Sequence, residues 1–385
     1  MTIINAKIYT MFGQHFENGY IEIEGKKISE IGNMRNFSGS GEFNANGALV
    51  FPGFIDCHTH MGLFEEGQVY ETDDANEIGD TITPHLRVID AINPFDRYFS
   101  DALRAGITSV VVSPGSANSI SGQVSAIKTY GVCIDDMVIK SPIAMKFSLG
   151  ENPKSTGEKD VPKTRMAIAA GIREALRKAE KCIKDLEENP NDNDFDIKNQ
   201  ALIDFLKSKA PAQFHAHRAC DIFTAMRLAH EFNLKFHIIH GTESYKIAEY
   251  LKKSNAGVFV GPIITDRSKP EILNFDLKYI KILHEAGIEI SITTDHPVIP
   301  IQHLPLCASI AAANGLGWEA ALHSITSVPA KLCGISDVVG TLEVGKDADI
   351  IVFNDDPLKV GVTPQLVICD GKVVVDNFNK GLIYG

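Results

Sequence analysis

Two histidines separated by one residue follow a short apolar run near the start of the chain. Residues 49–55 lead into Asp56, His58 and His60. Because side chains alternate along a β-strand, His58 and His60 face the same side and can bind one metal ion together. Taken alone, such a pair is more often a polar strand edge than a pair of metal ligands. Its interpretation therefore depends on what the rest of the chain supplies.

Three later segments end in the residue types that a metal site needs. Each is a short run of apolar or β-branched residues, followed by turn residues and a segment with helical periodicity. The runs end at or near His215, His240 and Asp295. The repetition predicts that the ends of several strands carry the ligands of one site.

Between roughly residues 50 and 335, strands alternate with helical segments, a pattern that predicts a parallel (β/α)8 barrel. The expected barrel strands are 50–56, 107–112, 137–140, 143–149, 212–216, 235–240, 257–260 and 288–294. A barrel places the C-terminal ends of its strands on one face, so ligands far apart in sequence can converge there. The predicted cluster comprises His58, His60, His215, His240 and Asp295.

Such a cluster has a definite chemistry. A divalent metal lowers the pKa of a bound water towards neutrality and polarises a carbonyl, while a carboxylate takes the proton. Asp295 can both ligate the metal and carry a proton from water to the leaving group. We therefore expect Asp295 and His240 to be the catalytic residues among the predicted metal ligands.

Both ends of the chain predict β-hairpins. Alternating stretches at 7–10 and 20–32 are matched by stretches at 349–353, 365–369 and 372–375. We expect residues 1–49 and 340–385 to form one composite β-sandwich, beside a metal-binding barrel over residues 50–339.

The order Pro-Gly-Phe-Ile-Asp-x-His-x-His over residues 52–60, followed by two lone histidines and an aspartate, resembles the amidohydrolase superfamily. The segments 326–335 and 340–353 resemble the part of such chains that leads out of the barrel. The resemblance implies a metal-dependent hydrolase that cleaves an amide or cyclic amide bond of a small molecule. Imidazolonepropionase-like and dihydroorotase-like enzymes are the most similar. Imidazolonepropionases, however, carry His-Ala-Asp-Glu where this chain has His-Ala-His-Arg at 215–218, and they lack an early bridging ligand.

The resemblance also implies a ligand that bridges two metal ions, and the chain offers two residues for it. Lys146 looks like the carboxylated lysine of dihydroorotase-like enzymes. Glu151 looks like the bridging glutamate of sugar-amide deacetylases. If neither binds metal, the two form an ion pair and the site holds one ion.

Three residues beside the predicted ligands are candidates for substrate binding. His217 and Arg218 directly follow His215 and would point into the mouth of the site. Arg218 could hold a substrate carboxylate through two hydrogen bonds, or it could form an ion pair with a neighbouring acid. His296 adjoins Asp295 and could contact substrate or orient Asp295 through a hydrogen bond.

The composition of the chain limits the classes of partner that it can bind. The net charge of -12 argues against nucleic acid and anionic membranes, both of which are polyanions. The seven scattered cysteines suggest neither disulfides nor a thiolate zinc site, and the N-terminus lacks a secretory pattern. We expect a cytoplasmic homo-oligomer that binds zinc, or manganese, iron or cobalt.

Two other functions are alternatives to the hydrolysis of an amide. One is a deaminase of the same superfamily, and the other is a catalytically silent barrel that serves as a binding or assembly module.

Overall fold

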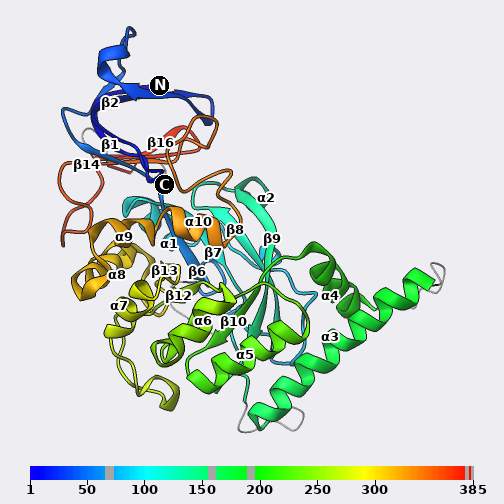
Figure 1. The fold of residues 1–385 in the computed structure, drawn as a ribbon. Helices are drawn as coiled ribbons and strands as arrows, with labels where there is room; N and C mark the ends of the chain where they lie inside the picture. The colour runs from blue at the N-terminus through cyan, green and yellow to red at the C-terminus, as the bar shows by residue number, and fades with distance from the viewer. Residues whose placement is uncertain (66–72, 155–161, 189–195, 378–380, 383–385) are drawn as a thin grey trace.

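The computed structural model describes residues 1–65, 73–154, 162–188, 196–377 and 381–382. Within them, the chain forms an eight-stranded sheet and a separate nine-stranded sheet. Figure 1 shows the nine-stranded sheet, coloured blue and red, lying above the nearly closed barrel formed by the other. The predicted fold class, a barrel beside a smaller β unit built from both termini, is confirmed.

The barrel strands follow the order of the sequence around the sheet. They are β6 (Phe54–Thr59), β7 (Ile107–Val112), β8 (Ile120–Lys128), β9 (Val138–Ser148), β10 (Ala212–Ala216), β11 (Phe236–His240), β12 (Val258–Val260) and β13 (Ile290–Ile292). Strands β9 to β13 pair in parallel. Most of their residues are buried, which is why they read as nearly continuous apolar runs.

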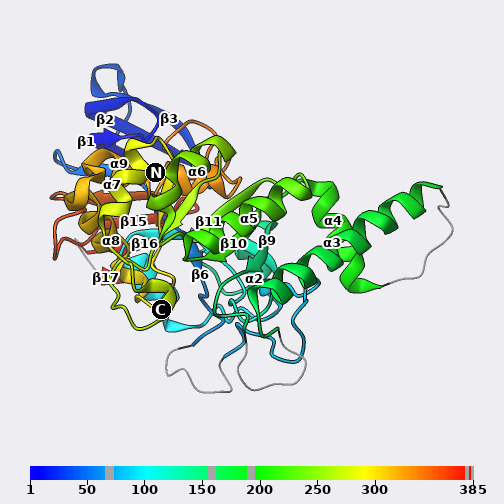
Figure 2. The same ribbon diagram turned by 60° about the horizontal axis from the view of Figure 1, so that its bottom comes forward.

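Helices surround this sheet (Figures 1 and 2). They are α1 (Arg97–Arg104), α2 (Ile134–Met137), α3 (Arg165–Glu188), α4 (Ile197–Ser208), α5 (Ala219–Glu231), α6 (Ala248–Ser254), α7 (Lys278–Glu285), α8 (Leu304–Ala311), α9 (Trp318–His323) and α10 (Ser327–Leu332). The side chain of Asp196 accepts hydrogen bonds from the first backbone N–H groups of α4, and so caps it. No helix in the described parts of the chain is both long and apolar enough to cross a membrane.

The early barrel strands differ from the prediction. The expected third and fourth strands, 137–140 and 143–149, are one strand, β9. Pro142 lies between the two expected segments, but the strand passes through it at an irregularity in the β8–β9 register. The third strand is β8, which begins within the serine- and glycine-rich segment 113–123, a composition that is typical of a turn. It pairs antiparallel with both neighbours.

The expected first barrel strand, 50–56, is also divided. Residues Leu49–Pro52 form β5 of the terminal sheet, and the barrel strand β6 begins at Phe54. A side chain at Gly53 would collide with Thr108, because a Cβ there would lie 2.0 Å from the Thr108 Oγ1. The glycine thus allows the chain to pass from one sheet to the other in close contact with β7.

The terminal sheet joins strands from both ends of the chain. Its strands are β1 (Thr2–Tyr9), β2 (His15–Glu24), β3 (Lys27–Asn33), β4 (Phe43–Asn44), β5, β14 (Ile350–Phe353), β15 (Leu366–Cys369), β16 (Lys372–Asp376) and β17 (Gly381–Leu382). The junction is the antiparallel pair β5–β14. The two ends share one apolar core, in which Ile8 and Val50 lie with Ile350. The domain bounds 1–49, 50–339 and 340–385 stay a prediction.

Candidate active site

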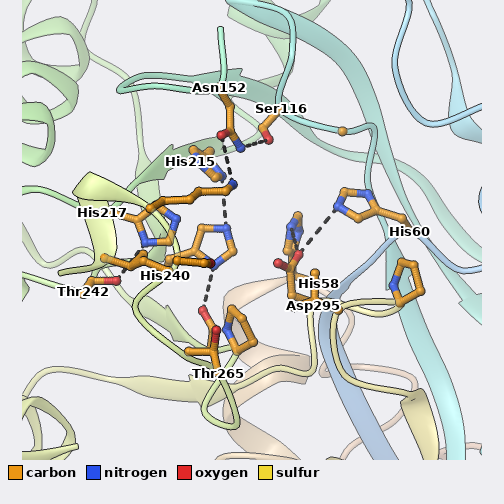
Figure 3. A pocket seen from close by; sticks show the side chains of 18 of the residues that line it. His58, His60, Ser116, Asn152, His215, His217, His240, Thr242, Thr265 and Asp295 are labelled. Atoms are coloured by element: carbon orange, nitrogen blue, oxygen red, sulfur yellow. Dashed lines mark hydrogen bonds and ion pairs between the residues drawn. The ribbon is translucent and has the colours of Figure 1, made fainter. Parts of the chain in front are cut away.

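A cavity of about 440 Å³ opens at the C-terminal ends of the barrel strands. Parallel strands β9 to β11 all point their C-terminal ends towards it, which is why residues far apart in sequence meet there. Seven of the predicted site residues line it: His58, His60, Lys146, His215, His217, His240 and Asp295. Figure 3 shows that the imidazoles and Asp295 form two groups that face each other.

The first group consists of His58, His60 and Asp295. His58 lies on β6, His60 directly after it, and Asp295 after β13. Asp295 Oδ1 lies 3.4 Å from His58 Nε2 and 3.6 Å from His60 Nε2. One carboxylate oxygen and two imidazole nitrogens at these separations are a donor set that a divalent ion can join.

The second group consists of His215, His217 and His240, from the ends of β10 and β11. His240 Nε2 lies 3.0 Å from His215 Nδ1. The His217 ring stacks on His240 with 4.4 Å between the ring centroids, and its Nδ1 lies 2.8 Å from Thr242 Oγ1. In each group the possible ligand atoms lie within 4.8 Å of one another.

Lys146 lines the same cavity, and its charge acts on imidazoles of both groups. It projects from β9, is completely buried, and has its Nζ 3.5 Å from His58 Nε2. Burial lowers the pKa of Lys146 to about 7 against the attraction of Asp295, because the charged ammonium loses its hydration. The neutral amine is therefore accessible near physiological pH.

Burial sets the protonation of the other side chains. It lowers the pKa of His58 and His215 well below the ordinary value, and the charge of Lys146 adds to the effect. Burial likewise lowers the pKa of His240 to about 3. Asp295 behaves oppositely: burial disfavours its charged form, but His240, His58 and His60 hold its pKa well below the usual range. The site therefore combines neutral imidazoles at His58, His215 and His240 with an ionised carboxylate, the forms that bind metal.

Two imidazoles are oriented by backbone carbonyls. The His60 Nδ1 lies 2.7 Å from the Ser113 carbonyl oxygen, and the His240 Nδ1 lies 2.7 Å from that of Gly261. A carbonyl only accepts, so each Nδ1 carries the proton and each Nε2 offers a lone pair. This is the arrangement found in metal-binding histidines. The donor atoms thus fit divalent ions in type, tautomer and charge.

The backbone around the site is itself constrained. His240 and Asp295 have φ values of 72° and 53°, in the left-handed region that residues with a Cβ seldom adopt. Such strain persists where the surroundings impose it and is common at functional sites. Asp56 supplies part of this constraint, since its carboxylate accepts hydrogen bonds from the Thr293 hydroxyl at 2.6 Å and the Thr294 N–H at 3.0 Å. These bonds join β6 to the segment that carries Asp295.

Three predicted site residues are not among those that line the cavity: Glu151, Arg218 and His296. Glu151 lies in the bend after β9 and begins a turn, because its carbonyl accepts a hydrogen bond from the Lys154 N–H, and its own backbone N–H donates to Glu271. Arg218 is the N-cap residue of α5, one position beyond the side chain that reaches the cavity. His296 is buried against Tyr98, and its Nδ1 accepts a hydrogen bond from the backbone of Ile301. From the sequence we also expect the loops 61–92 and 151–163 to shape the choice of substrate, and two parts of them, 66–72 and 155–161, lie outside the described residues.

The structure also adds residues that the sequence reasoning missed. Lys269, Asn152 and Ser116 line the mouth of the cavity, where Lys269 Nζ lies 3.2 Å from Asn152 Oδ1 and Asn152 Nδ2 donates to Ser116 Oγ at 2.7 Å. Asp56 had a signal in the sequence, because it shares the alternation of His58 and His60. No local signal marked Glu271, a buried acid in the loop after β12.

Comparisons with known proteins agree with this fold. The profile of the amidohydrolase family matches residues 49–374. The crystal structure of an amidohydrolase from Thermotoga maritima is 36% identical with a TM-score of 0.92, covering 97% of this chain and 99% of that chain.

Two curated proteins are more distant. Amidohydrolase tasK of Hapsidospora irregularis is 28% identical over 365 residues, which are 87% of this chain and 37% of that protein. This chain therefore spans little more than a third of that relative. The imidazolonepropionase of Thermoplasma volcanium is 22% identical over 389 residues, covering 94% of this chain and 91% of that protein.

Proposed function

Because the chain belongs to the amidohydrolase family, and so to the hydrolases of carbon–nitrogen bonds other than peptide bonds, we propose that it is a metal-dependent enzyme that cleaves an amide or cyclic amide bond of a small molecule. The observation that carries the proposal is the pair of ligand groups that line one cavity together with the buried Lys146. A cavity of about 440 Å³ is within the size range of small-molecule sites.

We assign one divalent ion to each group. His58, His60 and Asp295 would hold the first, and His215 and His240 the second. When bound, the two ions would activate water and polarise the carbonyl of the scissile bond. Zinc is our first candidate, with manganese, iron and cobalt as alternatives, since imidazole and carboxylate ligands accept all four.

We assign the bridge between the ions to Lys146 rather than Glu151. Lys146 lines the cavity, with its amine 3.5 Å from His58 Nε2, whereas Glu151 is not one of the lining residues. A buried ammonium beside several imidazoles would be an unpaired charge, which is costly. Addition of the neutral amine to carbon dioxide, with loss of one proton, gives a carbamate anion with two oxygen donors. Burial favours the neutral amine that this addition requires.

We assign the proton transfer to Asp295. Its carboxylate is ionised at neutral pH and stands beside His58 and His60. From there it can take a proton from the attacking water and deliver it to the leaving nitrogen, which must be protonated to depart. His240, oriented by its hydrogen bond to the Gly261 carbonyl, would help to hold the second ion on the side of the site where the scissile carbonyl binds.

We place recognition of an anionic substrate group on Lys269 instead of Arg218. Lys269 lines the mouth of the cavity beside Asn152 and Ser116, which could add hydrogen bonds to a carboxylate. His217 lines the same cavity and stays a candidate for substrate contact. A homo-oligomeric assembly and a cytoplasmic location stay proposals from the sequence.

The proposal is tested by metal content together with hydrolysis. Purified chain is assayed for metal per chain, and a panel of N-acyl amino acids and cyclic amides is screened before and after chelation. We expect two ions per chain and amide hydrolysis that is lost on chelation and restored by metal. Release of ammonia from a ring carbon would instead identify a deaminase, and a chain without metal after reconstitution would refute the proposal.

A further inference from the structure

A buried carboxylate lies behind the second ligand group and has no role in the mechanism above. Glu271 lies in a short 3-10 turn, Pro270–Ile272, and is 1% exposed. Its Oε2 accepts a hydrogen bond of 3.0 Å from the Glu151 N–H. Its Oε1 is buried and has no hydrogen-bond partner among the described residues. Burying an ionisable group in this state is costly, so the free oxygen needs an explanation.

The free oxygen faces two imidazoles of the second group. Glu271 Oε1 lies 3.9 Å from His215 Nε2 and 3.8 Å from His217 Nε2. The His215 Nε2 is itself a buried nitrogen without a hydrogen-bond partner in the described parts of the chain. A donor and an acceptor that both lack partners therefore face each other, and a shift of about 1 Å brings them to hydrogen-bond distance.

The neighbouring imidazole decides which His215 nitrogen must carry the proton. His240 donates from Nδ1 to the Gly261 carbonyl, so its Nε2 lone pair points at His215 Nδ1, 3.0 Å away. Figure 3 shows these two rings side by side. For both facing nitrogens to bind one ion, His215 must carry its proton on Nε2, the atom that faces Glu271.

We propose that Glu271 is a positioning residue for the second metal ion. Its Oε1 accepts a hydrogen bond from His215 Nε2–H and so fixes the tautomer in which His215 Nδ1 is a free ligand. For His60 and His240 this task falls to backbone carbonyls; for His215 it falls to a side chain. The inference rests on the proposed function, because it requires that a second ion binds between His215 and His240.

Asp221 provides a matched control. It is also a buried carboxylate, 2% exposed, on the neighbouring helix α5. Its partner is Arg165, whose Nε lies 2.7 Å from Asp221 Oδ1, and within the described residues its carboxylate forms no ion pair with an imidazole. A loss of metal affinity caused only by disturbing buried charge would appear in variants of both acids.

The experiment is a stepwise titration of the metal-free full chain with Zn²⁺, in which bound metal is measured by equilibrium dialysis. It compares wild type with Glu271→Leu, Glu271→Gln and Asp221→Asn. We expect Glu271→Leu to weaken the second ion by about 10- to 100-fold, the usual effect of removing such a partner. The first ion should bind as in wild type, which also reports that the variant is folded. Glu271→Gln keeps an oxygen acceptor and should restore part of the affinity, and Asp221→Asn should bind both ions normally.

The outcomes separate the inference from the proposed function. A wild type that binds two ions, with a Glu271→Leu variant that binds them equally well, overturns the inference alone. Equal weakening of both ions also overturns it, because that is a structural effect. A wild type that fails to bind two ions refutes the binuclear site itself.

A second measurement does not depend on the folding of any Glu271 variant. Nitrogen-15 spectra of histidine in the zinc-loaded wild type, with the His215 signal assigned by its loss in His215→Gln, should show the proton on Nε2 and the metal on Nδ1. The reverse assignment would overturn the inference.

Discussion

Replacing Lys128 with methionine should destabilise the junction between the barrel and the C-terminal part of the chain. Lys128 ends β8, and its side chain is 5% exposed. Its Nζ lies 2.7 Å from Asp349, 2.9 Å from Asp370 and 3.0 Å from Asp347. Methionine fills a similar volume but removes the charge, so the three carboxylates would lose the cation that they share.

The expected loss of stability depends on which cation each carboxylate retains in the Lys128→Met variant. Asp347 retains Lys27 at 2.7 Å, and Asp370 retains Lys26 at 2.9 Å. Asp349, only 3% exposed, keeps hydrogen bonds but no cation among the described residues. Leaving one buried charge without its partner costs about 3–5 kcal/mol. The matched control is Lys27→Met, which removes a half-exposed lysine from the same network and should cost about 1 kcal/mol or less.

The assay is urea unfolding at pH 7, followed by circular dichroism and by the fluorescence of Trp318, the single tryptophan. Trp318 lies on α9 and packs edge-on against Tyr9 and Phe51 of the terminal sheet, so it reports on the same junction. Coincident transitions would justify a single free energy of unfolding. Asp349→Asn should destabilise the wild type and stabilise the Lys128→Met variant, because in the variant it removes the unpaired charge.

Lowering the pH should reduce the difference in unfolding free energy between wild type and Lys128→Met. Burial raises the pKa of Asp370, but Lys128 and Lys26 outweigh burial and hold it below the ordinary value. The stabilisation is therefore complete above the unfolded pKa of about 4 and is lost as pH falls through the lowered value. If Lys128→Met costs no more than Lys27→Met, or if Asp349→Asn changes both backgrounds equally, the reasoning about this network is wrong.

Three further predictions concern the site and the base of the barrel. Asp295→Asn should reduce kcat for amide hydrolysis by about 10²-fold or more, measured as initial rates with saturating Zn²⁺, because the proton carrier is lost; an unchanged rate would exclude Asp295 from the chemistry. Lys146→Ala should lower the bound metal from two ions per chain towards one, counted by elemental analysis. The control is Lys140→Ala, which replaces an exposed lysine on the same strand and should leave the metal content unchanged. Equal metal content in both variants would show that Lys146 does not bridge the ions. His237→Asn should flatten the acid loss of stability, because burial lowers the pKa of His237 to about 4 and the unfolded state takes up its proton first as pH falls below about 6.5. Between pH 8 and pH 5 the wild type should lose about 2 kcal/mol more of its unfolding free energy than the variant, and parallel curves for both proteins would contradict this.

Much of the architecture follows from local patterns in the sequence. The second and fifth barrel strands lie where the apolar and β-branched runs of the sequence predict them. The early strands could not be placed in the same way. Strand β8 is rich in small polar residues and runs antiparallel to its neighbours, so its burial depends on what packs against it.

The candidate site, like the fold, could be predicted from the sequence only in part. His58, His60, His215, His240 and Asp295 stand at strand ends, where the alternation of side chains and the closure of a barrel bring them together. The choice between Lys146 and Glu151 could not be made from the sequence alone, because two equally suitable chemical groups lie only five positions apart in the chain. The strand carries Lys146 into the cavity, and the turn that follows carries Glu151 out of its lining.

The sequence by itself determined the types of donor atoms and the strand ends on which they lie, because both are properties of short segments. Only the tertiary structure decided how those segments meet. The Asp56 bonds to Thr293 and Thr294, and the approach of Glu271 to His215, join residues from opposite ends or separate loops of the barrel. Such contacts depend on the register and curvature of the whole sheet, which no local pattern encodes.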